Sequence, residues 1–127
     1  MHNFRKLNIW IKSMELVTEI YKLTNTFPSY ERFGIISQMQ RAALSCPSNI
    51  AEGSAKSSNK DFSRFLEISV GSLFELETEL IVSKNLEYIS NETFEVFQNK
   101  IVELQKMIIA FKNQLYKEEQ RTKSKDE

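Results

Sequence analysis

Polar side chains recur at three- and four-residue intervals along two stretches of this 127-residue chain. The first stretch contributes Gln38, Arg41, Ser45, Ser48 or Asn49, and Glu52. The second contributes Ser72, Glu75 and Glu79, with Gly71 beside them to admit a second backbone closely. Because this spacing places residues on one helix face, we expect two facing polar rows in which Arg41 pairs with a glutamate. Such a network fixes helix register or a subunit contact, and a solvated or purely intramolecular network is the simpler interpretation.

Carboxylates on adjacent helices can also bind metal ions. The candidates are Glu52, Glu67, Glu75 and Glu79. Di-iron bundles require Glu-x-x-His pairs, whereas the single histidine, His2, lies at a terminus that is expected to fray. Nucleophilic catalysis by Ser45 or Cys46 lacks an internal histidine as base, and Cys46 falls on an apolar row. We therefore predict no metal, no cofactor, no catalytic residue and no small-molecule substrate.

Basic residues are concentrated in the first half of the chain, although the net charge is zero. Residues 1–66 hold nine positive and five negative side chains, and residues 67–112 hold four positive and eight negative ones. Phosphates would supply most of the affinity of a basic face for RNA or DNA. The candidate nucleic-acid contacts are Arg41, Lys56, Lys60 and Arg64. The alternative is that oppositely charged helices attract one another within the chain.

Apolar periodicity predicts that four helices position these residues. The first is expected over residues 8–24, and the apolar stripe on it consists of Leu7, Trp10, Met14, Val17 and Tyr21, widened by Ile9, Leu16, Ile20 and Leu23. The second is expected from about Ser29 to Glu52, with Gly53 as its C-terminal stop. Pro47 lies inside it and removes one backbone donor, so we expect a kink between Ala43 and Pro47, with a complete break as the alternative.

Serine caps mark the last two helices. Ser58 and Asp61 fit a capping box before a third helix that extends to about Glu87. Its core row is Phe62, Leu66, Ser69, Leu73, Leu76 and Leu80. Ser90 caps the fourth helix, whose seam consists of Phe94, Phe97, Ile101, Leu104, Ile108, Phe111 and Leu115. The predicted fold is an all-α, up-down-up-down antiparallel four-helix bundle over residues 1–116, followed by a disordered polar tail over residues 117–127.

Composition places the chain among folded cytoplasmic proteins. Hydrophobic residues make up 41% and charged residues 27%, with only three glycines, which suits a helical domain with few turns. Charges interrupt every apolar run, so no membrane span is expected. One cysteine and the absence of an apolar leader predict neither disulfides nor export. The seams together with Phe33, Ile35, Ile36 and Ile81 supply more apolar surface than one slender bundle covers, which predicts a homo-oligomer.

A long motif in the second predicted helix carries a family resemblance. Residues 41–53 read Arg-Ala-Ala-Leu-Ser-Cys-Pro-Ser-Asn-Ile-Ala-Glu-Gly, within a signature that spans residues 31–54. This string resembles the signature of the four-helix-bundle proteins encoded in intervening sequences of bacterial 23S ribosomal RNA genes. Supporting matches are Phe4, Leu7, Trp10, Tyr21, Pro28, Gly71-Ser72-Leu73, Glu75, Leu76 and Glu77. The resemblance covers residues 4 to about 115, and Cys46 departs from it where a branched aliphatic residue is usual.

The resemblance implies a toroidal homopentamer of four-helix bundles. Relatives include the accessory protein of diversity-generating retroelements, which binds nucleic acid and its reverse transcriptase. The family-motif positions that this chain inherits are Gln38, Arg41, Ser45, Asn49, Glu52, Ser72, Glu75 and Glu77. We therefore expect a non-enzymatic homo-oligomeric scaffold or binding protein organised by Arg41, Glu52 and Glu75. The alternative is an accessory protein that binds RNA or DNA through its basic first half.

Overall fold

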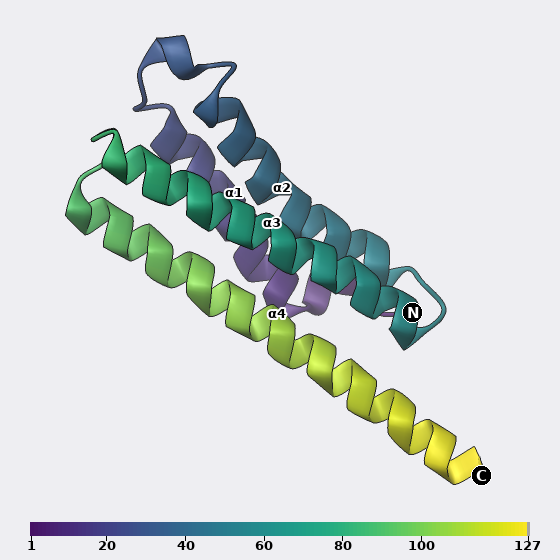
Figure 1. The fold of residues 1–127 in the computed structure, drawn as a ribbon. Coiled ribbons are helices and arrows are strands. Elements are labelled where there is room, and N and C mark those ends of the chain that lie inside the picture. The colour runs from purple at the N-terminus through teal and green to yellow at the C-terminus, as the bar shows by residue number, and fades with distance from the viewer. Residues whose placement is uncertain (127) are drawn as a thin grey trace.

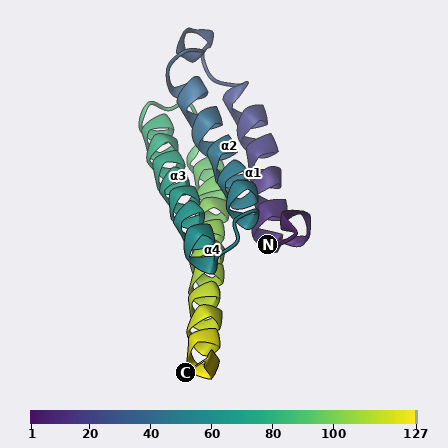
Figure 2. The same cartoon turned by 90° about the vertical axis from the view of Figure 1, so that its right-hand side faces the viewer.

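Four long helices lie side by side in the computed structural model, which describes residues 1–126 and the side chains of residues 1–124 (Figures 1 and 2). The elements are η1 (Phe4–Lys6), α1 (Asn8–Thr24), η2 (Ser29–Glu31), α2 (Ile35–Ser54), α3 (Asn59–Asn85) and α4 (Asn91–Asp126). The described residues form no strand. Successive helices run in opposite directions, which confirms the all-α, up-down-up-down bundle.

The bounds of α1 agree with the sequence prediction, but its buried face differs. The residues that α1 buries are Ile9, Ser13, Leu16, Ile20 and Thr24. Met14 and Tyr21, expected in the core, are 41% and 40% exposed. Small polar residues can occupy core positions here because the hydroxyls of Ser13 and Thr24 each donate to a carbonyl one turn earlier in α1. The buried face of α1 is therefore rotated from the one predicted by hydrophobicity alone.

The second helix begins later than predicted. Residues Ser29–Glu31 form the short 3-10 helix η2 rather than the first turn of α2, which starts at Ile35. Gly34 separates them with φ −104° and ψ −119°, outside the helical region. A Cβ atom at Gly34 would lie 2.6 Å from Glu31 Oε1, so the absent side chain leaves room for that carboxylate. The loop between α1 and α2 consequently projects from one end of the bundle (Figure 1).

The motif in α2 forms one continuous helix. Pro47 lies inside α2, so the alternative of a break there is wrong, and the kink stays a prediction. Ser69 Oγ of α3 donates to the Cys46 carbonyl oxygen at 2.9 Å. Cys46 directly precedes Pro47, whose backbone nitrogen has no hydrogen to donate. Gly53 is not a stop signal, because it is a buried helical residue without a positive φ. A Cβ atom at Gly53 would lie 2.6 Å from Phe65 Cβ, so this glycine permits close packing of α2 on α3.

The predicted caps of α3 and α4 are confirmed. Ser58 Oγ accepts a hydrogen bond from the Asp61 backbone nitrogen at 3.1 Å, and Ser90 Oγ accepts one from that of Thr93 at 3.1 Å. All six residues of the predicted α3 row are buried, and the α4 seam supplies five more buried residues. The core therefore lies where the periodicity of these two helices places it.

The N-terminus is anchored to the bundle, which corrects the expectation that it frays. The His2 backbone nitrogen donates to the Ser54 carbonyl oxygen at 3.0 Å. The His2 ring lies 5.1 Å from the Phe62 ring and 6.2 Å from the Phe111 ring, measured between centroids. These contacts close the end of the bundle opposite the α1–α2 loop.

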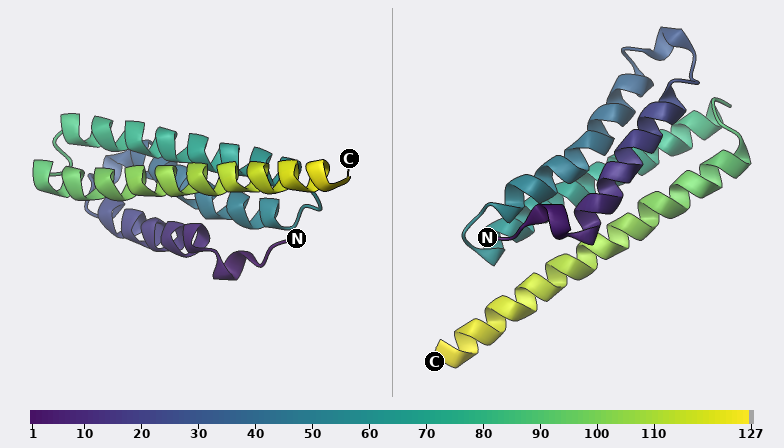
Figure 3. Two further views of the ribbon diagram at one scale, coloured as in Figure 1. Left: turned by 90° about the horizontal axis from the view of Figure 1, so that it is seen from below. Right: turned by 180° about the vertical axis from the view of Figure 1, so that it is seen from behind.

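The C-terminal part of α4 projects beyond the other helices (Figure 3). Leu115 is the last buried residue among the side chains that the structure describes, yet α4 continues to Asp126. The disordered tail predicted over residues 117–127 is thus helical through residue 126, and residue 127 lies outside the described residues. Lysine, glutamate, glutamine and arginine dominate this stretch and have high helix propensity, which explains helix without a buried face.

Truncation after Tyr116 should leave the bundle intact. We expect the free energy of unfolding in urea to change by less than about 0.5 kcal/mol, since no buried side chain is removed. The matched control is Leu115→Ala, which empties a buried position and should cost about 2 to 4 kcal/mol. If truncation costs as much as the Leu115 substitution, residues 1–116 are not the folding unit.

Candidate functional site

The two predicted polar rows meet between α2 and α3. Ser45 Oγ lies 2.8 Å from Ser72 Oγ, and Asn49 Nδ2 donates to Ser45 Oγ at 3.0 Å and to the Ser45 carbonyl oxygen at 2.8 Å. With the bond from Ser69 described above, these contacts form what we call the serine cluster: Ser45, Asn49, Ser69 and Ser72. The cluster joins the two helices beside Pro47, so this half of the rows is an intramolecular network.

Towards the α1–α2 loop, the same two rows open into a groove. The lining residues of this α2–α3 groove are Glu31, Ile35, Gln38, Glu75, Thr78, Glu79, Val82 and Leu86. Glu79 is only 7% exposed, and its Oε1 atom is buried without a hydrogen-bond partner among the described residues. A buried, unpaired carboxylate oxygen is energetically unfavourable, so the groove presents an unsatisfied acceptor.

Burial and a neighbouring acid both perturb this carboxylate. Burial, and to a smaller extent the nearby Glu75 carboxylate, raise the pKa of Glu79 to about 7, against the opposing effect of the positive charge of Arg41. Arg41 itself is exposed and makes no ion pair within the described residues. The expected ion pair between Arg41 and a glutamate is thus not formed, although the charge of Arg41 acts on Glu79 electrostatically.

Besides Arg41, two motif residues lie outside both the serine cluster and the groove lining. Glu52 is exposed near the C-terminal end of α2. Glu77 faces α4 instead of α2, where Glu77 Oε1 accepts a hydrogen bond from Gln105 Nε2 at 2.8 Å and Oε2 accepts one from Gln98 Nε2 at 3.4 Å. Glu77, a family-motif position, therefore lies in neither polar row. Successive glutamates at 75 and 77 must point to different helix faces, because two residues span about 200° of an α-helix.

Comparison with known proteins assigns the family. The model of the family described as 23S rRNA-intervening sequence protein matches residues 5–110. The chain belongs to this family. It is also similar to the crystal structure of a protein of unknown function from the S23 ribosomal protein family of Bacteroides thetaiotaomicron, with a TM-score of 0.77 and 27% sequence identity, covering 83% of this chain and 95% of that one. No curated protein matches the chain.

In this 23S rRNA-intervening sequence protein, the motif residues divide by role. Ser45 and Gly53 hold α2 against α3 through a hydrogen bond and close packing, and Asn49 supports Ser45 from within α2. Gln38 and Glu75 line the open groove instead. The motif therefore combines a structural part near Pro47 with an exposed part in the groove.

The predicted nucleic-acid contacts do not form one patch. Lys60 and Arg64 line a second groove, between the start of α3 and the C-terminal part of α4, together with Lys112 and Lys123. Lys56 lies nearby on the neighbouring loop, with its ammonium 5.1 Å from the centroid of the Phe65 ring. Arg41 is separate, because it lies beside Glu79 near the other end of α3. The α4 lysines were not foreseen, since only the bundle brings α4 beside the start of α3.

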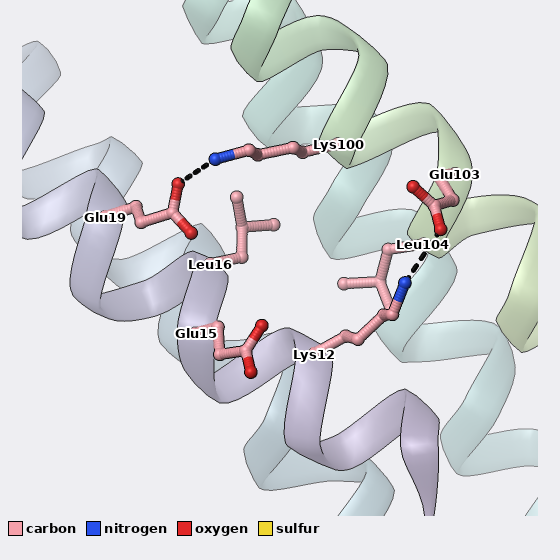
Figure 4. A pocket seen from close by; sticks show the side chains of 7 residues that line it. All are labelled: Lys12, Glu15, Leu16, Glu19, Lys100, Glu103 and Leu104. Carbon is pink, nitrogen blue, oxygen red and sulfur yellow. Dashed lines mark hydrogen bonds and ion pairs between the residues drawn. The ribbon is translucent and has the colours of Figure 1, made fainter.

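A third depression lies between α1 and α4 (Figure 4). Leu16 and Leu104 are buried beneath it, Lys12 Nζ lies 2.8 Å from Glu103 Oε1, and Lys100 pairs with Glu19. Sequence reasoning did not single out these ion pairs, because each joins helices about 80 to 90 residues apart in the chain. The charges are solvent-exposed and screened by salt, so they fasten α1 to α4 only weakly.

Neither metal ligation nor thiol chemistry finds support in the described residues. No group of three or more histidine, cysteine, aspartate or glutamate side chains there is placed to hold a metal ion. None of the described helices has the length and apolar character to cross a membrane.

Cys46 is buried, and burial raises the pKa of its thiol to about 12, which keeps it protonated at neutral pH.

We expect Cys46 to resist thiol reagents in the folded protein. At pH 8, an aromatic disulfide reagent should release no chromophore over the time in which a free cysteine reacts completely. The same protein in guanidinium chloride should react fully, which controls for oxidation. Rapid native-state labelling would contradict the burial of this thiol.

Proposed function

We propose that this protein is a non-enzymatic scaffold or binding protein that assembles as a homopentamer in the cytoplasm. The observation that carries the proposal is the apolar surface of α3. Four large apolar side chains of this helix and one that directly follows it are 38–53% exposed: Ile68, Phe74, Ile81, Val82 and Leu86. Apolar patches of this kind mark protein contacts in soluble proteins. The family resemblance supplies the expected number of subunits.

The chemistry of the site supports binding over catalysis. Ser45 accepts a hydrogen bond from Asn49 and has no base beside it, and the Cys46 thiol is protonated. The groove instead offers carboxylates and aliphatic side chains, which suit recognition of a basic or amphipathic surface.

Light scattering at micromolar concentration tests the assembly. We expect a mass close to five times the 14.9 kDa of one chain, stable on moderate dilution. A strictly monomeric species at that concentration would remove the scaffold proposal.

A second candidate function is binding of RNA or DNA. It is favoured by the four basic side chains that surround the groove between α3 and α4: Lys60, Arg64, Lys112 and Lys123. Acidic neighbours temper this basic surface, since Glu67 Oε1 lies 2.7 Å from Lys112 Nζ and Asp61 Oδ1 lies 3.6 Å from Arg64 Nη1. The net charge of zero further limits long-range attraction of polyanions.

Filter binding at two salt concentrations tests this candidate. If the groove binds phosphates, Lys60→Ala and Arg64→Ala should each reduce the slope of log K against log salt by about one. Lys22→Ala on α1, which also removes one exposed charge, should leave the slope unchanged. Absence of salt-dependent retention by the unmodified protein would reject nucleic-acid binding.

A further inference from the structure

The side chains in and beside the α2–α3 groove carry more negative than positive charge. Glu79 Oε1 is buried and unpartnered, and Glu75 adds a second carboxylate one turn earlier on α3. The groups that surround Glu79 are Glu75 on its own helix, Gln38 and Arg41 on α2, and Glu31 on η2. Three carboxylates against one exposed arginine leave room for a further positive charge. Val82 and Leu86 add exposed aliphatic surface beside these acids.

The α1–α2 loop presents a side-chain pair of matching chemistry. Phe33 is 88% exposed, although an aromatic side chain gains much from burial, so it is a candidate for a contact with another molecule. The Arg32 guanidinium carbon lies 5.4 Å from the centroid of the Phe33 ring, so the two side chains form a combined cationic and aromatic unit, the Arg32–Phe33 tip. Tyr88 OH donates to Glu31 Oε2 at 2.8 Å, which ties the preceding residue to the segment that follows α3. The tip is thus presented on an anchored loop.

The tip and the groove lie on opposite flanks of α2. Arg32 and Phe33 line a depression with residues of α1 and α2, whereas the groove lies between α2 and α3. The loop that carries the tip projects from one end of the bundle (Figure 2), and the groove reaches the same end because Glu31 of η2 and Ile35, the first residue of α2, line it. In a ring of protomers that stand parallel to the ring axis, one side of each copy contacts the opposite side of the next. The two contacting surfaces must therefore lie at the same level along that axis. The tip and the groove meet this requirement.

We infer that the Arg32–Phe33 tip of one protomer fills the α2–α3 groove of its neighbour, where Arg32 pairs with Glu75 and Glu79 and Phe33 packs against Val82 and Leu86. This inference rests on the proposed homo-oligomer. The contact is heterologous, because it uses two different surfaces, and repetition closes into a ring when the rotation allows. The contact would place a positive charge beside Glu79, whose buried Oε1 has no hydrogen-bond partner among the described residues of its own chain.

Complementary variants test the contact. Arg32→Glu combined with Phe33→Ser removes the tip, and Glu75→Lys combined with Leu86→Ser removes the groove. All four side chains are exposed, so both variants should keep the helical circular dichroism of the original protein. Each variant alone should weaken assembly at least about 30-fold, as loss of a hot-spot contact does, and sediment as the protomer. Arg5→Glu is the matched control, because Arg5 is exposed and stacks on Phe4 yet should not affect assembly.

An equal mixture of the two variants gives the decisive result. The tip of one variant and the groove of the other are both intact, so the mixture should form one-to-one dimers at high concentration that cannot close into a ring. A mixture that stays monomeric overturns the inference. So does a tip variant that assembles like the original protein, and in that case the proposed homo-oligomer stands. If the original protein is itself monomeric, the proposed function fails first.

Discussion

Glu79→Gln is expected to stabilise the dissociated protomer at pH 8, by about 1 to 3 kcal/mol. Glutamine keeps the shape of the side chain and removes a buried charge that has no partner for one oxygen. Because burial raises the pKa of Glu79 from 4.5 to about 7, the folded protomer holds a proton that the unfolded chain has lost between these two pH values. The associated stability is fully present below about pH 4.5 and is lost as the pH rises to about 7.

Urea unfolding of the tip variant across this pH range measures the effect without assembly. Its free energy of unfolding should fall between pH 4.5 and pH 7, and Glu79→Gln should abolish most of that fall. Glu52→Gln removes an exposed carboxylate of α2 and should leave the profile unchanged. Destabilisation by Glu79→Gln at pH 8 would show that the carboxylate is already paired within one chain.

Gly53→Ala should destabilise the protein by about 1 to 3 kcal/mol. The added Cβ atom would lie 2.6 Å from Phe65 Cβ and 2.9 Å from Phe62 Cδ1, so α2 and α3 must separate or their side chains must leave preferred rotamers. The stability gained from the higher helix propensity of alanine is smaller than this steric cost. Urea unfolding at one fixed protein concentration provides the measurement.

Gly71→Ala is the control for Gly53→Ala, because both replace a glycine within a helix. No atom lies within 4 Å of a Cβ atom placed at Gly71, so alanine should stabilise α3 by about 0.5 to 1 kcal/mol. The two substitutions therefore have expected effects of opposite sign. A neutral Gly53→Ala would contradict the close approach of α2 and α3.

Local signals in the sequence predicted most helix limits. The first helix has the predicted bounds, and Ser58 and Ser90 cap α3 and α4 as expected, because capping depends on residues within one turn. The start of α2 was missed because Gly34, directly before it, has a non-helical backbone conformation that hydrophobic periodicity does not reveal. The buried face of α1 was misjudged because Ser13 and Thr24 enter the core with their hydroxyls bonded locally.

The candidate site was only partly accessible from sequence. The three- and four-residue spacing of polar side chains predicted two facing rows, one with Ser45 and the other with Ser72. The structure brings these two hydroxyls together. The burial of Glu79 and the unpaired state of Arg41 depend on how closely α2 and α3 pack, which spacing along one helix does not determine. The contact of Glu77 with α4 was not predicted, because the family motif identifies positions without saying which face each one occupies.

Native mass spectrometry of the purified protein at micromolar concentration tests the central claim, that this chain acts through assembly, most directly. We expect one dominant species that contains five copies of the 14.9 kDa chain, and loss of that species in the tip variant but not in Arg5→Glu. A single-copy species alone, under conditions in which the protein is folded, would contradict it.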